Sequence, residues 1–235
     1  MLARLVRNGA ALRNALLDLL FPPRCVVCRH SGTWLCASCA AQFEKILPPF
    51  CERCGRPLNG RASCRYCAQS PIVINGMRAV AFFDGALRQA IHAFKYLHRV
   101  ELADYFGTML SDYLLTFPLS VDTIIAVPLH WERERARGYN QAALLANTLG
   151  ARLHIPVWND ALRRIRATRS QTELTAEERR ANVRDAFVAS ARVRGARVLL
   201  IDDVCTTGAT MDACGTALYA QGAQAVWGLA VARAR

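Results

Sequence analysis

The sequence predicts an α/β protein in which a parallel sheet carries helices on both faces and is preceded by a small cysteine-rich domain. Two observations support this prediction. From about residue 79 onward, short apolar runs typical of strands alternate with amphipathic patterns typical of helices, which is the order found in parallel sheets. Before that point, eight of the ten cysteines lie between Cys25 and Cys67, in a segment without helical or strand periodicity.

Length and composition limit the class of protein. The chain has 235 residues, of which 53% are hydrophobic and 20% are charged, as is ordinary for a globular protein with a sizeable core. No stretch approaches the roughly 18 apolar residues that a membrane span needs. The formal net charge is +12, but only Lys45 and Lys95 are lysines among 30 basic residues. Such a bias partly reflects codon usage, so basicity alone is weak evidence for a nucleic-acid partner.

The first segment, residues 1–23, is predicted to form an amphipathic helix over residues 2–20 that ends at two prolines. Its leucine-rich face is expected to pack on the protein itself, with a membrane surface or a partner helix as the alternative. Charged residues interrupt every apolar run before it reaches the length of a signal-peptide core, so we expect a cytoplasmic protein. In that reducing compartment, paired cysteines indicate metal ligands rather than disulfides.

Residues 24–72 are predicted to form a small domain that binds two metal ions. Four C-x2-C turns supply the ligands, which are Cys25, Cys28, Cys36, Cys39, Cys51, Cys54, Cys64 and Cys67. Because two such turns complete a tetrahedral shell of four sulfurs, four turns predict two structural Zn²⁺ sites. Pairing of consecutive turns closes the shortest loops and is favoured, although interleaved pairing stays open. Iron–sulfur clusters use the same ligands and are a lesser alternative.

Arginines and aromatic residues lie between these cysteine turns. They are Arg24, Arg29, Arg53, Arg56, Arg61, Arg65, Trp34, Phe50 and Tyr66. This combination suits single-stranded nucleic acid, which binds through phosphate contacts and base stacking. The slightly favoured interpretation is that the arginines are solvated and the aromatic rings form the small core of the ribbon.

Residues 73–235 are predicted to form the α/β domain. Strands are expected at 79–83, 123–127, 198–201 and 225–231, and helices at 87–97, 102–115, 141–153 and 210–220. Residues 159–185 are polar and rich in arginine and fit neither pattern. We predict that they form a mobile hood that excludes water from a site beside it.

The most informative segment is residues 198–210, in which an apolar strand ends in Asp202 and Asp203 and a turn rich in glycine and hydroxyl groups precedes a helix. Backbone N–H groups at such a helix N-terminus can bind a phosphate, and the two carboxylates can accept hydrogen bonds from a sugar diol. The predicted ligand is therefore a sugar phosphate with free vicinal hydroxyls, bound at the carboxyl edge of the sheet. A Walker A loop is excluded, because no Gly-Lys-Ser/Thr is present.

This segment resembles the motif of type I phosphoribosyltransferases that binds phosphoribosyl pyrophosphate (PRPP), at all thirteen positions. The resemblance implies that Asp202 and Asp203 hold the ribose hydroxyls and are the candidate catalytic residues, with Mg²⁺ accompanying PRPP. The residues implied to bind the ribose and 5′-phosphate are Asp202, Asp203, Val204, Cys205, Thr206, Thr207, Gly208, Ala209 and Thr210. Those implied to bind pyrophosphate, in the loop after residues 123–127, are Pro128, Leu129, His130, Arg135 and Arg137.

Further motifs follow one another along the chain, beside the cysteines and the PRPP-like loop. They are His92-Ala93-Phe94-Lys95-Tyr96, Val127-Pro128-Leu129-His130, Arg137-Gly138-Tyr139-Asn140-Gln141, Gln171-Thr172-Glu173-Leu174, Arg179, Asn182 and Ala186-Phe187. In this order they resemble the ComF family of competence proteins, and the resemblance covers nearly the whole chain. The resemblance implies a double zinc ribbon joined to a phosphoribosyltransferase-like domain. It also implies a role in DNA uptake during natural transformation at the inner face of the cell membrane. The implied partners are single-stranded DNA and a competence helicase or other DNA-uptake proteins.

Three functions stay open at this point. The first is a PRPP-binding or nucleotide-binding factor in DNA uptake. The second is an active phosphoribosyltransferase that transfers 5-phosphoribose to a nucleobase, although the predicted hood lacks the lysine that some related enzymes place near the pyrophosphate. The third is a zinc-ribbon adaptor with a vestigial PRPP site, which the intact Asp-Asp loop disfavours. Cys205 is predicted to be an incidental small residue, and Cys214 to pack in the core.

Overall fold

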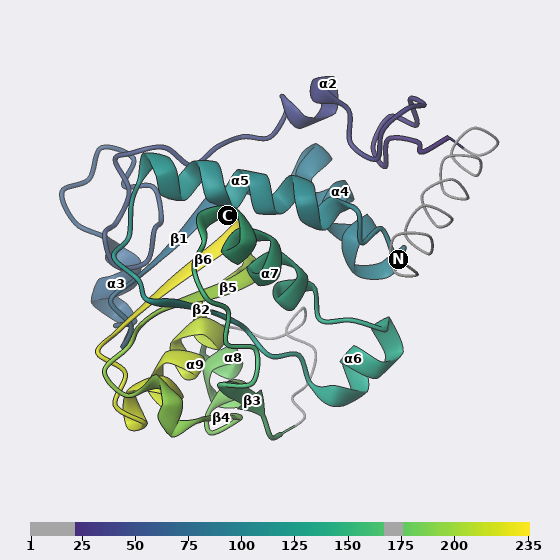
Figure 1. Cartoon of the computed structure of the whole chain (residues 1–235). Helices are drawn as coiled ribbons and strands as arrows, with labels where there is room; N and C mark the ends of the chain where they lie inside the picture. Colours follow the sequence, from purple (N-terminus) through teal and green to yellow (C-terminus); the bar gives the residue numbers. More distant parts are fainter. Residues whose placement is uncertain (1–21, 167–175) are drawn as a thin grey trace, which may run out of the picture.

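The computed structural model describes residues 22–166 and 176–235. The helix predicted over residues 2–20 lies outside the described residues. In the described part, helices cover both faces of a central sheet, and the cysteine-rich segment follows one edge of that sheet (Figure 1). This arrangement confirms the predicted α/β class and the cysteine-rich segment before it.

The central sheet has four parallel strands in the order β1-β6-β5-β2. They are β1 (Gly76–Phe82), β2 (Thr123–Ala126), β5 (Arg197–Cys205) and β6 (Ala225–Arg233). Because the sheet is covered on both faces, its strands have nearly continuous apolar sequences rather than alternating ones. The long buried runs in β5 and β6 place the core of the domain between these two strands and the helices.

Three of the strands are longer than the sequence predicted, and β6 ends at Arg233 rather than at residue 231. β1 begins at Gly76 rather than at residue 79, because the charged Arg78 interrupts the apolar run in the sequence. In the structure Arg78 is buried, with its guanidinium 4.9 Å from the centre of the Phe50 ring. β5 continues to Cys205 rather than ending at residue 201, so Asp202 and Asp203 belong to the strand itself.

Helices form the outer layers of the domain (Figure 1). α5 (Leu102–Thr116) and α7 (Gln141–Leu153) pack together on one face of the sheet, with α4 (Gly85–Tyr96) beside α5. α9 (Ala209–Ala220) covers the other face, and α8 (Ala176–Val183) packs on α9. No helix in the described residues has the length and apolar character needed to cross a bilayer.

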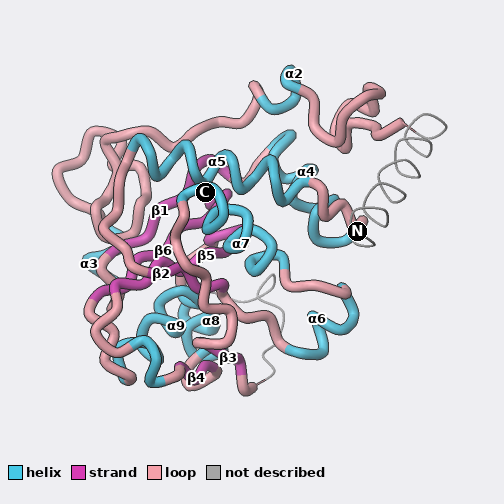
Figure 2. The backbone as a smooth tube through the Cα atoms, in the orientation of Figure 1, coloured by secondary structure: helices cyan, strands magenta, loops and turns pink. Residues whose placement is uncertain are grey.

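The cysteine-rich segment is almost entirely loop (Figure 2), with two short helices, α2 (Ala37–Ala40) and α3 (Arg65–Gln69). Its backbone nevertheless pairs with the outer edge of β1. Ile46 N donates to Val80 O (2.9 Å), and Met77 N donates to Arg53 O (2.7 Å). An exposed edge strand invites unwanted pairing, and this contact covers that edge. The segment is therefore built into the α/β domain rather than suspended from it.

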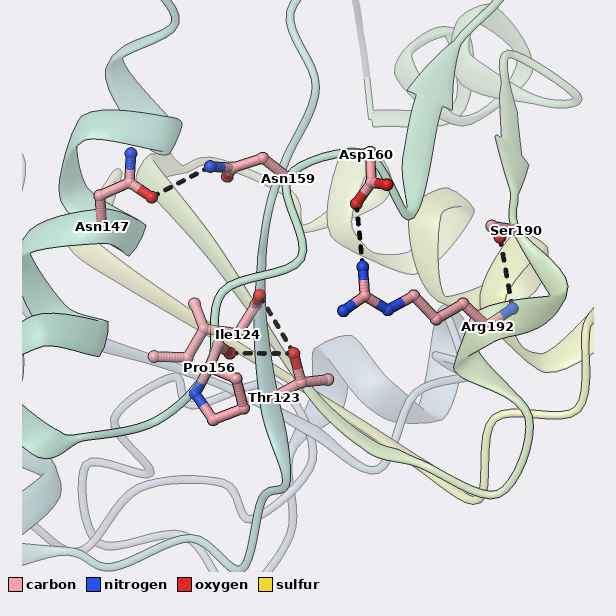
Figure 3. A network of polar contacts seen from close by, with 8 residues as sticks. All are labelled: Thr123, Ile124, Asn147, Pro156, Asn159, Asp160, Ser190 and Arg192. Atoms are coloured by element: carbon pink, nitrogen blue, oxygen red, sulfur yellow. Dashed lines mark hydrogen bonds and ion pairs between the residues drawn. The ribbon is translucent and has the colours of Figure 1, made fainter.

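The segment predicted as a hood, residues 159–185, contains β3 (Leu162–Arg164) and α8. β3 pairs antiparallel with β4 (Phe187–Ala189), which follows this segment in the chain. Residues 167–175 lie outside the described part of the chain. Two polar contacts fix the residues just before β3 (Figure 3). Asn159 Nδ2 donates to Asn147 Oδ1 (3.0 Å), and Asp160 forms an ion pair with Arg192 (3.4 Å). The sequence analysis missed β3 and β4, because strands of three residues are too short to show a period.

Candidate functional site

The eight clustered cysteines form two groups of four. We call Cys25, Cys28, Cys36 and Cys39 the first thiolate site, and Cys51, Cys54, Cys64 and Cys67 the second thiolate site. Within each group all sulfurs lie within 4.8 Å of one another. The grouping is the sequential one that loop length favoured.

The sulfur geometry fits zinc. A tetrahedral Zn²⁺ site with Zn–S bonds of about 2.3 Å has sulfur–sulfur edges of roughly 3.8 Å. The pairs Cys28–Cys36 and Cys54–Cys64 are 3.6 Å apart, and Cys51–Cys67 are 3.7 Å apart. All these cysteines are free thiols rather than disulfides. Four sulfur ligands leave no open coordination position, so both sites are structural.

A cavity of about 510 Å³ lies at the carboxyl edge of the sheet. Its walls come from α4, from the loop after β2 with the following short helix α6 (Trp131–Arg137), from β3, and from the loop between β5 and α9. The basic side chains that line it are Arg88, Lys95, Arg133, Arg137 and Arg164. Because these charges surround a single pair of carboxylates, the cavity favours a strongly anionic ligand.

Most of the predicted site residues lie at this cavity. Of the nine residues assigned to the ribose and 5′-phosphate, all except Thr207 line it. Of the predicted pyrophosphate residues, Pro128, Leu129 and Arg137 line it, together with Arg133 of the same arginine cluster. His130 and Arg135 are not among its described lining residues; His130 is buried 3.5 Å from Glu132, and Arg135 is exposed on α6.

The turn between β5 and α9 has the geometry of an anion-binding loop. Gly208 adopts φ +85°, and a Cβ at this position would lie 2.4 Å from Met77 Sδ, so only glycine fits. Within the described residues, no acceptor takes the amide hydrogens of Thr207 and Gly208. These amides lie at the N-terminus of α9, where the helix dipole attracts negative charge. The turn can therefore bind a phosphate.

Asp203 is the most constrained polar group of the site. Its side chain is only 3% exposed, and its Oδ1 lies 2.8 Å from the Lys95 ammonium. The other carboxylate oxygen, Oδ2, is buried and has no hydrogen-bond partner among the described residues. A buried acceptor without a donor costs about 1–3 kcal/mol, so a ligand that supplies a donor here gains that free energy.

The neighbouring Asp202 is perturbed by its surroundings. Burial raises the pKa of Asp202 to about 7, and repulsion from Asp203 acts in the same direction. Lys95 and the Asp203 amide, which donates to Asp202 Oδ1 (2.8 Å), oppose this rise. Burial lowers the pKa of Lys95, but its attraction to Asp203 and Asp202 raises that pKa above its ordinary value. Lys95 therefore stays charged and offsets the carboxylate pair.

The sequence analysis assigned no role at the site to α4, although Arg88, His92 and Lys95 of this helix all line the cavity. A signal for them was present. The three polar residues are spaced at i, i+4 and i+7 on a helix that is otherwise largely buried, so they share one face. The same spacing is typical of the solvent face of an amphipathic helix, so the sequence alone did not separate a site from solvent at these positions.

Two family models match the chain: a double zinc ribbon domain over residues 16–68 and a phosphoribosyl transferase domain over residues 136–234. Together with the geometry above, they define a phosphoribosyltransferase-type domain joined to a double zinc ribbon. The chain is 34% identical over 220 residues to the DNA utilization protein YhgH of Escherichia coli K12, covering 88% of this chain and 96% of that protein. It is 33% identical over 222 residues to competence protein F of Haemophilus influenzae, with the same coverage. The chain belongs to the ComF family of competence proteins.

Among solved structures, the fold is similar to that of the glutamine PRPP amidotransferase of B. subtilis. The TM-score is 0.39 at 21% identity, over 55% of this chain and 26% of that one. This likeness concerns the fold alone.

Proposed function

We propose that the cavity binds PRPP or a closely related 5-phosphoribosyl ligand together with Mg²⁺, and that this binding serves a role in DNA uptake. The observation that carries the proposal is the buried Asp203 Oδ2, which lacks a donor among the described residues in a cavity lined by basic side chains. A ribose hydroxyl supplies the missing donor, and the phosphate groups match the surrounding positive charge.

Each part of the ligand has a matching part of the cavity. Asp202 and Asp203 accept hydrogen bonds from the ribose diol. The loop of residues 204–210 donates amide and hydroxyl hydrogens to the 5′-phosphate. Arg133 and Arg137 face the same cavity and suit the pyrophosphate, because guanidinium groups bind phosphates in a bidentate way. Mg²⁺ prefers carboxylate and phosphate oxygens, and Asp202 with the ligand's phosphates offers this donor set.

Single-stranded DNA remains the proposed macromolecular partner, with a narrower contact surface than the sequence suggested. Several of the predicted stacking residues have partners within the protein: Tyr66 donates to Thr207 O (2.8 Å), Phe50 packs against Arg78, and Trp34 lies under Arg99. The exposed arginines of the ribbon are Arg24, Arg29, Arg53, Arg61 and Arg65, of which Arg53 also donates to Ile72 O. We therefore assign phosphate contacts to these arginines and no base stacking to the rings.

Isothermal titration calorimetry of the full chain with PRPP and Mg²⁺ tests the ligand. Asp203→Asn is expected to weaken binding at least about tenfold, because the asparagine keeps the size of the side chain but loses one acceptor and the charge. Asp104→Asn is the matched control, since Asp104 is exposed on α5 and pairs with Arg152 outside the cavity (2.9 Å). Absence of binding by the wild-type protein at millimolar PRPP would refute the proposal.

Transferase activity is the second candidate function, and Lys95 favours it. The predicted hood lacks the lysine that some related enzymes place near the pyrophosphate, and Lys95 provides a lysine ammonium group at the cavity instead. Release of pyrophosphate from PRPP, measured with a panel of nucleobases, separates the two functions. Release that depends on one base identifies a transferase, whereas binding without release identifies a ligand-regulated factor.

A further inference from the structure

The second thiolate site directly contacts the loop of residues 204–210, which is called the phosphate-binding loop below. Tyr66, which lies between the ligands Cys64 and Cys67, donates from its hydroxyl to Thr207 O at 2.8 Å. Arg56, two residues after the ligand Cys54, donates from Nη2 to Thr206 O at 3.3 Å. The two side chains also stack, with the guanidinium carbon 4.2 Å from the centre of the Tyr66 ring. Two consecutive carbonyls of the loop are thus held by one metal-binding module.

These carbonyl contacts determine where the loop's amide groups point. In a trans peptide, the carbonyl of one residue and the N–H of the next point in opposite directions. Holding Thr206 O and Thr207 O toward the ribbon therefore turns the N–H groups of Thr207 and Gly208 away from it. These are the two amides that have no acceptor among the described residues.

A third contact supports the loop from the turn that follows Cys54. Gly55 has φ +70°, and a Cβ there would lie 2.4 Å from Met77 O, so this turn rests on the β1 backbone. Met77 in turn packs on Gly208, where a Cβ would lie 2.4 Å from its sulfur. Both cysteine turns of the second site thus reach the loop, one through Tyr66 and the other through Arg56 and Met77.

We propose that Tyr66 and Arg56 are positioning residues for the phosphate-binding loop, and that the metal of the second thiolate site controls affinity for the 5′-phosphate through them. The inference rests on the proposed function, since it concerns the same cavity. It extends that function by giving a structural zinc site a direct effect on ligand binding. The four thiolates hold α3 and the turn before Gly55 in place, and without their metal neither donor has a fixed position.

The decisive variant is Tyr66→Phe, which removes one hydroxyl and keeps the ring that stacks on Arg56. We expect affinity for PRPP and for ribose 5-phosphate to fall about three- to tenfold, as loss of one orienting hydrogen bond predicts. Affinity for inorganic pyrophosphate is expected to stay within about twofold, because that group binds away from the loop. Zinc content is expected to match the wild type, and the thermal midpoint of the ligand-free protein is expected to fall by no more than about 5 °C, as loss of one hydrogen bond predicts.

Tyr105→Phe is the matched control, because Tyr105 contacts Phe43 near the first thiolate site (ring centres 6.3 Å apart) and has no described contact with the loop. A second pair of variants keeps the test valid if Tyr66→Phe folds poorly. Arg56→Gln is expected to weaken ribose 5-phosphate binding, whereas Arg152→Gln, which neutralises an exposed arginine of α7 that pairs with Asp104 outside the cavity, is not. In nuclear magnetic resonance spectra, the amide signals of Thr207 and Gly208 are expected to shift in Tyr66→Phe and to stay in Tyr105→Phe.

The outcomes separate the two proposals. If the wild-type protein binds no PRPP, the proposed function fails. If the wild type binds PRPP but Tyr66→Phe and Arg56→Gln leave ribose 5-phosphate affinity within twofold, the positioning role fails while the proposed function stands. An equal loss of affinity for pyrophosphate and for ribose 5-phosphate indicates general loosening of the cavity, and also overturns the positioning role.

Discussion

The two thiolate sites share their ligand type and their turn spacing but differ in what they touch. The first site lies over the α4–α5 corner: Trp34 sits 4.5 Å under the Arg99 guanidinium, and Phe43 packs on Tyr105. The second site holds two carbonyls of the proposed phosphate-binding loop and supports β1. Among the described contacts, none joins the first site to that loop. The same ligand set thus stabilises the periphery in one case and, in the other, the loop between β5 and α9 at the cavity.

The largest expected difference between the two sites follows removal of one zinc ligand. Cys54→Ser and Cys39→Ser each remove one buried thiolate and are expected to release one metal. Cys54→Ser is expected to weaken PRPP binding about hundredfold or more, because the loop loses all three of its contacts. Cys39→Ser is expected to change it less than about threefold. Metal analysis measures the zinc content of the two variants, and calorimetry measures their affinity for PRPP. An equal loss of affinity in the two variants would contradict the expected difference between the two sites.

A pair of glycines sharpens the same comparison at the level of stability. Gly32 of the first site has φ +105° and open space around it, so Gly32→Ala carries only backbone strain, about 1–2 kcal/mol. Gly55 of the second site has φ +70° and lies against the Met77 carbonyl, so Gly55→Ala adds a clash with backbone and is expected to cost about 3–4 kcal/mol. Urea unfolding measures both. Equal losses would show that the Gly55 contact can relax.

The sequence predicted the features that are local along the chain. Both thiolate sites follow from two-residue spacings, and the carboxylate loop follows from one thirteen-residue segment. The contacts between these features were not predictable. Arg56 and Thr206 are 150 positions apart, and Tyr66 and Thr207 are 141 apart, so no spacing rule connects them. The arginines and rings between the cysteines were considered for nucleic acid, and only the folded chain shows Arg56 and Tyr66 occupied by the loop.

A change of pH affects the carboxylate pair without removing either metal. The pKa of Asp202 is about 7 in the folded protein and near 4 in the unfolded chain, so the folded state holds a proton that the unfolded state releases between these values. Unfolding free energy is therefore expected to fall as pH rises from about 4 to 7, and Asp202→Asn should remove that slope. At about 1.4 kcal/mol for each pKa unit, it should stabilise the protein by roughly 4 kcal/mol at pH 8. Urea unfolding of both proteins across this range checks the slope, and parallel curves would contradict the raised pKa.

Ligand binding is expected to change in the opposite direction. Ionised Asp202 accepts the ribose hydroxyls, so wild-type affinity for PRPP should rise between pH 6 and 8 relative to that of Asp202→Asn, which binds about tenfold more weakly at pH 8. Calorimetry at several pH values measures the ratio of the wild-type affinity to the Asp202→Asn affinity. Ionisation of PRPP affects both proteins equally and therefore does not change this ratio. A constant ratio across this range, with zinc content unchanged, would show that Asp202 does not contact the diol.

The smallest effect is expected from the cation–π pair of the first site. Each module stacks one arginine on one ring: Arg99 on Trp34 at 4.5 Å and Arg56 on Tyr66 at 4.2 Å. Such a pair contributes about 0.5–1 kcal/mol at a partly exposed position, so Arg99→Gln is expected to lower unfolding free energy by that amount and to leave PRPP affinity unchanged. Arg56→Gln removes a stack of similar geometry and also frees Thr206 O. If Arg99→Gln weakens PRPP binding as much as Arg56→Gln does, the loss comes from charge or general packing, and the loop has no special dependence on the second site.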